Sequence, residues 1–89
     1  MTKFLIYTRE DPPCGYCVSA KRLLENKGFA FTNQVVGRDL LMEEFKEKFP
    51  DQRTVPLIFA DEEGLRVRVG GYNELQTYIT QLSVKGLNL

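Results

Sequence analysis

The stretch KFLIYTREDPPCGYCVSAKRLLENKGFAFTNQVV, residues 3–36, sets the architecture that the rest of the chain extends. It begins with a continuous apolar run at residues 3–8, which suits a central strand covered on both faces. Residues 15–27 have the spacing of a helix that Gly28 ends, and residues 29–36 return to a strand pattern. Strand, helix and strand in this order predict a βαβ unit with parallel strands and a right-handed crossover.

A second helix is predicted directly after this unit. Residues 37–49 repeat apolar side chains at helical spacing and carry charged side chains on the remaining surface. We expect this helix to start at residues 37–39 and to end before Pro50, because proline cannot continue a helix.

Two strands and a last helix complete the pattern. Residues 56–60 and 65–69 predict strands on either side of a turn, and the strict alternation of the second is typical of an edge strand. The last helix follows Gly70 and Gly71, with Asn73 as its expected cap. The order βαβαββα predicts an α/β fold, in which a four-stranded mixed sheet carries three helices over its two faces.

Length and composition exclude several classes of protein. With 89 residues, 43% of them hydrophobic and 27% charged, we expect residues 1–89 to form a single globular domain with one core. Twelve Lys and Arg balance twelve Asp and Glu, so no net charge attracts nucleic acid or a lipid surface. No signal-peptide pattern opens the chain, and we expect the protein to stay in the cytoplasm.

Cysteine and histidine content narrows the chemistry. The chain has two cysteines and no histidine, which excludes Cys-His nucleophilic pairs, Ser-His-Asp triads and mixed Cys/His zinc sites. A structural disulfide between Cys14 and Cys17 would close a very small loop and remove little entropy from the unfolded chain. For a cytosolic protein, the remaining roles for the two cysteines are a redox-active pair and a metal-binding pair.

The position of Cys14-Gly-Tyr-Cys17 favours redox chemistry. The motif lies between the first strand and the first helix, where free backbone N–H groups and the helix dipole stabilise an anion. In such motifs the pKa of the first cysteine falls from about 8.5 to between about 3.5 and 7.5. We therefore expect Cys14 to attack disulfides as a thiolate, and Cys17, on the buried face of the helix, to resolve the mixed disulfide.

Three motifs together resemble those of the glutaredoxins, a family with the thioredoxin-like fold, over essentially the full chain. The motifs are Cys14-Gly-Tyr-Cys17, Thr54-Val-Pro56 and Gly70-Gly71-Tyr72. The small size is similar to that of the compact virus-encoded members. The resemblance implies a monomeric thiol-disulfide oxidoreductase that needs no metal and uses glutathione to reduce protein disulfides or glutathione mixed disulfides. Ribonucleotide reductase is the client protein that the family suggests.

By the same resemblance, a set of residues is expected to hold glutathione near Cys14. Pro56 should follow a cis peptide bond, and Val55 should pair its backbone with the cysteine part of glutathione. Basic side chains and the start of the last helix should bind the carboxylates of glutathione. An aromatic ring should form one wall of the binding site. The full set is Arg9, Tyr16, Arg53, Thr54, Val55, Pro56, Gly71, Asn73 and Glu74.

Departures from the family pattern leave two alternatives open. Gly15 stands where members usually carry proline, and glycine there accompanies, in some members, an iron–sulfur cluster held between two subunits and glutathione. A redoxin that receives electrons from thioredoxin reductase is the other alternative. Glu74 stands where aspartate is common, and its greater length makes a poorer helix start for binding a carboxylate.

Overall fold

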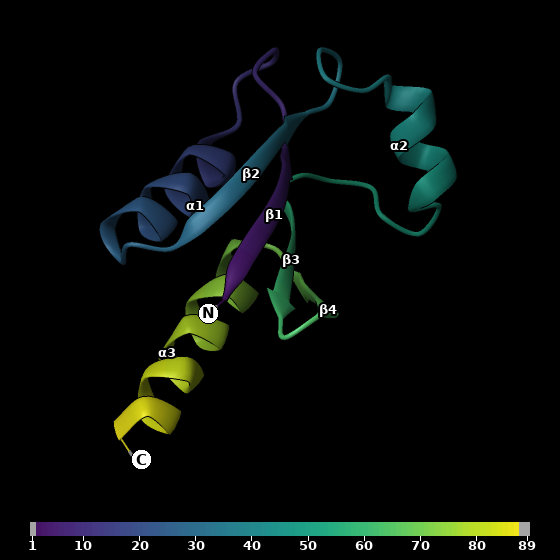
Figure 1. The fold of residues 1–89 in the computed structure, drawn as a ribbon. Helices are drawn as coiled ribbons and strands as arrows, with labels where there is room; N and C mark the ends of the chain where they lie inside the picture. The colour runs from purple at the N-terminus through teal and green to yellow at the C-terminus, as the bar shows by residue number, and fades with distance from the viewer. Residues whose placement is uncertain (1, 88–89) are drawn as a thin grey trace.

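The computed structural model describes residues 2–87 and contains within them four strands and three helices (Figure 1). In chain order the elements are β1 (Lys3–Thr8), α1 (Gly15–Asn26), β2 (Ala30–Val35), α2 (Met42–Lys48), β3 (Leu57–Glu62), β4 (Leu65–Gly70) and α3 (Tyr72–Leu87). The strands lie in the order β2-β1-β3-β4, with β1 and β2 parallel and the other neighbouring pairs antiparallel. The predicted βαβαββα order and four-stranded mixed sheet are confirmed.

Strand β1 lies inside the sheet and is buried from both sides. Its side chains alternate, so that Phe4 and Ile6 belong to one hydrophobic cluster and Tyr7 to another. A strand covered on both faces needs apolar residues at nearly every position, which explains the continuous run in the sequence.

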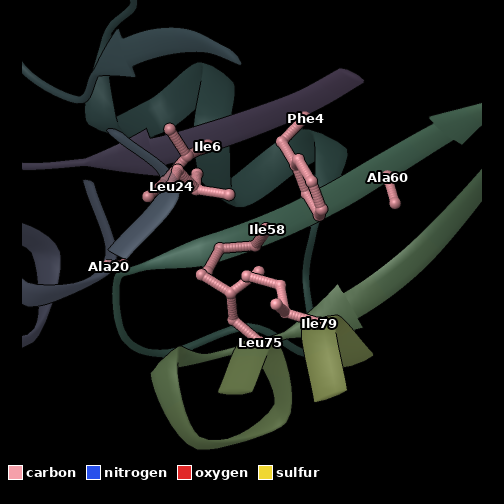
Figure 2. Packing of buried hydrophobic residues seen from close by; sticks show 8 residues of the cluster. All are labelled: Phe4, Ile6, Ala20, Leu24, Ile58, Ala60, Leu75 and Ile79. Carbon is pink, nitrogen blue, oxygen red and sulfur yellow. The ribbon is translucent and has the colours of Figure 1, made fainter. Parts of the chain in front are cut away.

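One face of the sheet is covered by α1 and α3, which lie on the same side in Figure 1. The cluster under these helices includes Ala20 and Leu24 from α1, both with no exposed surface. Figure 2 shows Ile58 of β3 pointing toward Leu75 and Ile79 of α3. The apolar faces predicted for both helices are therefore the buried ones.

The other face of the sheet is covered by α2, on the far side in Figure 1. Its cluster is mainly aromatic: the ring centroid of Tyr7 lies 5.5 Å from that of Phe45 and 5.2 Å from that of Phe49. The Phe49 ring in turn lies 5.5 Å from the ring of Phe59. Offset and edge-on aromatic contacts of this kind hold the short helix against the sheet.

The predicted start of α2 is wrong, because the helix begins at Met42 and not at residues 37–39. Gly37 has φ of 98°, which breaks helical geometry, and the Asp39 carboxylate accepts a hydrogen bond from the N–H of Val35 at 2.8 Å. The same bond lowers the pKa of Asp39 below its usual value. A side chain that bonds the preceding backbone favours a turn over a helix, and the segment before Leu41 is a turn.

Other boundaries also differ from the prediction, most clearly at the end of β3 and at the start of α3. Strand β3 runs on to Glu62, so the hairpin closes through Glu63 and Gly64, whose φ values are 52° and 83°. Positive φ at both positions gives the turn the twist that matches antiparallel strands. Asn73 lies inside α3 and does not cap it, because the helix already begins at Tyr72.

Candidate active site

Cys14 occupies the N-cap of α1. Its backbone is extended, with φ of −126° and ψ of 102°, and the backbone N–H of Cys17 donates a hydrogen bond to its Sγ at 3.1 Å. The first turn of the helix carries no acidic residue. A helix N-terminus with an N–H donated to sulfur is the geometry that favours a thiolate, and a thiolate at Cys14 in the reduced protein stays a prediction.

Cys14 and Cys17 form a disulfide, with their Cα atoms 5.2 Å apart. Cys14 is 7% exposed and Cys17 is 1% exposed, so Cys14 is the more accessible of the pair. Cys17 lies on the buried face of α1, as expected from its helical spacing. The two sulfurs therefore have unequal access to a partner, which is the arrangement that an attacking and a resolving thiol require.

Val55 and Pro56 lie beside the disulfide, joined by a cis peptide bond as the resemblance implied. The carbonyl oxygen of Val55 is 3.7 Å from Cys14 Sγ, although the oxidised sulfur has no proton to donate. Extended backbone next to the reactive sulfur offers hydrogen-bonding groups to a strand-like ligand. A second cis peptide bond, Asp11–Pro12, precedes the cysteines and was not predicted from the sequence.

A cavity of about 380 Å³ opens beside these residues and brings most of the predicted set together. The residues that line it are Tyr16, Gln52, Thr54, Val55, Pro56, Gly70, Gly71, Tyr72, Asn73 and Glu74. The ring of Tyr16 is 66% exposed and lies 6.1 Å from the ring of Tyr72, so the two form an aromatic wall. The segment before β3, the first turn of α1 and the start of α3 thus share one site.

Arg9 and Arg53 are not brought into this cavity. Both line a separate, small cavity of about 40 Å³, which also includes Val55 and the α2 residue Phe45. Arg9 Nε donates to the carbonyl oxygen of Pro12 at 3.0 Å, which turns its side chain toward its own loop. Neither basic residue therefore lines the larger cavity, although Thr54 and Val55 line both.

Three lining residues were absent from the predicted set: Gln52, Gly70 and Tyr72. Gln52 Nε2 donates to the carbonyl oxygen of Thr54 at 2.9 Å, and its Oε1 accepts from Arg68 at 2.7 Å. Gln52 thereby connects the segment before the cis proline to strand β4. Gly70 and Tyr72 belong to the Gly70-Gly71-Tyr72 motif, so the sequence already pointed to them. No local pattern marks Gln52.

Glu74 closes the start of α3. Its Oε1 accepts a hydrogen bond from the backbone N–H of Gly71 at 2.7 Å, and the N–H of Leu75 donates to the carbonyl oxygen of Gly71 at 3.0 Å. Gly71 is thus the cap position of the helix, and Glu74 supplies the reciprocal side-chain bond of a capping box. The role expected for Asn73 is filled by this pair.

The part of the chain that the structure describes, residues 2–87, offers neither a metal-ligand cluster nor a membrane-spanning helix. Within it, no group of three or more His, Cys, Asp and Glu side chains is placed to hold a metal ion. No helix there is long and apolar enough to cross a membrane. The cysteine pair and the cavity beside it are therefore the best-supported site among the described residues.

Comparison with known proteins gives the same result. The glutaredoxin family model matches residues 4–65. The chain is similar to glutaredoxin 3 of Escherichia coli K12, with 35% identity over 75 residues that cover 84% of this chain and 83% of that protein. Glutaredoxin 3 of E. coli O157:H7 matches to the same extent.

Two solved structures share the fold. The crystal structure of glutaredoxin 1 from Francisella tularensis, complexed with cacodylate, has a TM-score of 0.69 and 27% identity, covering 92% of this chain and 96% of that one. The solution structure of glutaredoxin from Brucella melitensis has a TM-score of 0.66 and 32% identity, covering 98% and 88%. The thioredoxin-like fold expected from the three motifs is confirmed. With Cys14 and Cys17 paired at the start of α1 and the family model matching most of its length, the chain belongs to the glutaredoxin family and is a thiol-disulfide oxidoreductase.

Proposed function

We propose that this oxidoreductase is glutathione-dependent and reduces protein disulfides or glutathione mixed disulfides. The observation that carries the proposal is the cavity beside Cys14, which gathers Tyr16, the Thr54-Val55-Pro56 segment and the start of α3 in one place. A tripeptide disulfide needs an extended backbone to pair with, a wall for its thiol arm and polar groups at its ends. The cavity offers each of these next to a sulfur at a helix start.

The reaction with a glutathione mixed disulfide begins with the Cys14 thiolate. It attacks the glutathione sulfur, the bond to the client sulfur breaks, and the client thiolate leaves and takes a proton from water. A second glutathione thiolate then attacks the sulfur that Cys14 holds, which yields glutathione disulfide and the free Cys14 thiolate. No electron carrier other than glutathione is needed.

The reaction with a protein disulfide uses both cysteines. Cys14 attacks one client sulfur and forms a mixed disulfide, and the thiolate of Cys17 attacks Cys14 Sγ to release the reduced client. This leaves the Cys14–Cys17 disulfide, the state that the structure contains. Two glutathione molecules in sequence restore the dithiol and leave as glutathione disulfide.

For glutathione itself we assign the backbone of Val55 to the cysteine part of the tripeptide. Gly71, Asn73 and Glu74 are assigned to one carboxylate end, at the start of α3. Arg9 and Arg53, which line the small cavity together with Val55, are assigned to charge pairing with a carboxylate.

Serine substitutions test this function. We expect Cys14→Ser to abolish turnover and Cys17→Ser to retain activity on glutathione mixed disulfides, because only the outer sulfur is needed for that reaction. Turnover is measured in an assay coupled through glutathione and glutathione reductase, with an assay coupled through thioredoxin reductase in parallel. Unchanged activity of Cys14→Ser would overturn the mechanism, and activity only with thioredoxin reductase would overturn the glutathione dependence.

The cellular setting follows from the same proposal. We propose that the protein works in the cytoplasm as a monomeric single domain and that ribonucleotide reductase is among its clients. A pull-down with Cys17→Ser traps clients as mixed disulfides on Cys14, and reductant releases them for identification.

A second candidate function is an iron–sulfur cluster held between two chains, with Gly15 as the observation in its favour. Gly15 is exposed, and a Cβ at this position would meet nothing within 4 Å, so there is open space beside Gly15, next to Cys14 in the chain. Cys14 would supply one thiolate ligand in each chain and glutathione the others, because the described residues offer no larger ligand group. Anaerobic reconstitution tests this: visible absorption and a dimer would support the cluster, and a colourless monomer would exclude it.

A further inference from the structure

Two hydrogen bonds in series connect strand β4 to the segment before Pro56. Arg68 Nη2 donates to Gln52 Oε1 at 2.7 Å, and Gln52 Nε2 donates to the carbonyl oxygen of Thr54 at 2.9 Å. Gln52 and Thr54 line the cavity beside Cys14, whereas Arg68 is not among its lining residues. A residue outside the cavity therefore holds, through one amide side chain, backbone that the cavity offers to a ligand.

The guanidinium of Arg68 decides which way the Gln52 amide faces. A guanidinium has donors and no acceptor, so the amide oxygen faces Arg68 and the amide nitrogen faces Thr54. With the amide reversed, its oxygen would lie against the carbonyl oxygen of Thr54, and the two acceptors would repel each other. Arg68 is itself held by Asp51, at 3.6 Å, and by the Phe49 ring, whose centroid is 5.8 Å from the guanidinium carbon. The direction of the amide is therefore fixed by contacts outside the cavity.

The hydrogen bond to Thr54 acts on Val55, because the carbonyl of Thr54 and the N–H of Val55 belong to one planar peptide group. Fixing the direction of the carbonyl therefore fixes the direction of the N–H. A carbonyl that accepts a hydrogen bond also polarises its peptide group and makes the N–H a stronger donor. Val55 is the residue whose backbone we assigned to the cysteine part of glutathione, and its own carbonyl oxygen lies 3.7 Å from Cys14 Sγ.

We propose that Arg68 and Gln52 are positioning residues that hold the Val55 backbone in the direction in which a peptide disulfide pairs with it. The inference rests on the proposed binding of glutathione to that backbone. Neither side chain takes part in the exchange of sulfur bonds. The pair accelerates the reaction of disulfides that carry a peptide backbone and leaves the reaction of small disulfides without one unchanged.

Two disulfides separate backbone pairing from the reactivity of Cys14: glutathione disulfide carries a peptide backbone and hydroxyethyl disulfide does not. Each is mixed with the reduced Cys17→Ser protein. The Cys14 thiolate attacks one sulfur and keeps that half as a mixed disulfide, while the other half leaves as a thiolate and takes a proton from water. Intact mass spectrometry follows the adduct and gives a second-order rate constant.

The ratio of the two rate constants, divided by the same ratio for N-acetylcysteine in solution, is the peptide preference. A variant that contains less folded protein lowers both rate constants and leaves this ratio unchanged. The peptide preference therefore responds to positioning and not to stability.

Methionine substitutions remove each half of the connection. We expect Arg68→Met and Gln52→Met each to lower the peptide preference about fivefold, the size of one lost hydrogen bond. Arg68→Lys keeps a donor for the amide oxygen and should restore most of the preference. The matched control is Arg66→Met on the same strand, which removes the same charge and breaks the ion pair with Asp61 but touches no lining residue, and it should leave the preference unchanged.

A double-mutant cycle tests whether Arg68 acts through Gln52. If it does, Arg68→Met has no further effect in the Gln52→Met protein, and the double variant has the preference of Gln52→Met alone. A direct attraction between the Arg68 charge and the anionic glutathione disulfide would instead be lost again in the double variant. Such multiplied losses would overturn the positioning role of Arg68.

The remaining outcomes separate this inference from the proposed function. A peptide preference that is present in the parent and unchanged in Arg68→Met would overturn the positioning role and leave the glutathione-dependent function standing. A parent protein without any peptide preference would overturn the binding of glutathione to Val55 and this inference with it. Failure of Cys14 to react with either disulfide would overturn the thiol mechanism itself.

Discussion

Tyr78 and Glu62 form a link between α3 and the β3–β4 hairpin. The Tyr78 hydroxyl donates to Glu62 Oε2 at 2.7 Å, and Thr2 Oγ1 donates to Glu62 Oε1 at 3.0 Å, so one carboxylate joins three parts of the chain. Burial and the bond to Glu62 raise the pKa of Tyr78 to about 12. The phenol therefore remains a donor throughout the neutral range.

Removing the Tyr78 hydroxyl tests how much this link contributes to the free energy of unfolding. We expect Tyr78→Phe to lower the free energy of unfolding by about 1 kcal/mol, because the hydrogen bond is lost while the ring still packs on Phe4. Urea unfolding monitored by circular dichroism measures the change. Tyr16→Phe is the control, since the Tyr16 ring is exposed and its loss of a hydroxyl should change stability by less than about 0.5 kcal/mol.

The same tyrosine predicts a dependence of stability on alkaline pH. Its pKa is raised to about 12 in the folded protein and is near 10 when unfolded, so the unfolded chain loses the proton first. The contribution of Tyr78 is complete below about pH 10 and is lost as pH rises toward 12. Urea titrations at several pH values should show this decline in the parent protein and a shallower one in Tyr78→Phe; equal slopes would contradict the assignment.

Helix α1 begins in a way that should accept proline in place of Gly15. Gly15 is the first residue of the helix, where proline is favoured, and Cys14 already has the extended backbone that a residue before proline adopts. A Cβ at Gly15 would contact nothing within 4 Å. The glycine is therefore not required by packing within the described chain.

We expect Gly15→Pro to raise the free energy of unfolding by about 0.5 kcal/mol, because it restricts the unfolded chain, and to raise Tm by about 3 °C. Differential scanning calorimetry of the oxidised protein measures the shift. At the other end of α1, Gly28 has φ of 76°, and Gly28→Ala should instead lower stability by about 1 kcal/mol. A loss of stability in Gly15→Pro would show that the N–H of Gly15 has a structural role.

The two faces of the sheet are held in different ways. The buried cluster on the α1 and α3 face is mainly aliphatic and has contributions from two long helices, whereas the α2 face depends on one short helix and a few aromatic rings. Figure 1 shows α2 joined to the rest of the molecule through long connecting segments. Phe45, at 3% exposure, is the buried residue of α2 and the anchor of that face.

Truncating this anchor should destabilise the complete fold. We expect Phe45→Ala to lower the free energy of unfolding by about 3 to 5 kcal/mol, through lost apolar burial and the cavity left behind. Urea unfolding gives the value. Leu41→Ala, at the N-cap position before the same helix, is the control and should change stability by less than about 0.5 kcal/mol, since Leu41 is 59% exposed. A small effect of Phe45→Ala would mean that α2 is dispensable for the core.

Local pattern was enough to predict the elements and the reactive pair. Continuous apolar runs and, at residues 65–69, strict alternation identified the strands, and helical spacing identified the buried faces of α1 and α3. The Cys14 and Cys17 spacing at a strand-to-helix junction indicated thiol chemistry. These features depend on residues close together in the chain. Side chains repeat every 3.6 residues along a helix and every two residues along a strand, so these features can be recognised from the spacing of apolar residues in the sequence.

Contacts between distant segments had to come from the folded molecule. Examples are the link from Arg68 through Gln52 to Thr54 and the absence of Arg9 and Arg53 from the lining of the larger cavity. The placing of α2 on one face of the sheet, with α1 and α3 on the other, is a further example. Each depends on how β1, β3 and β4 are placed side by side, and no repeat within one segment carries that information. Amino-acid pattern specifies what a segment forms and which side it buries, whereas the partners of a surface side chain are fixed by packing across the sheet.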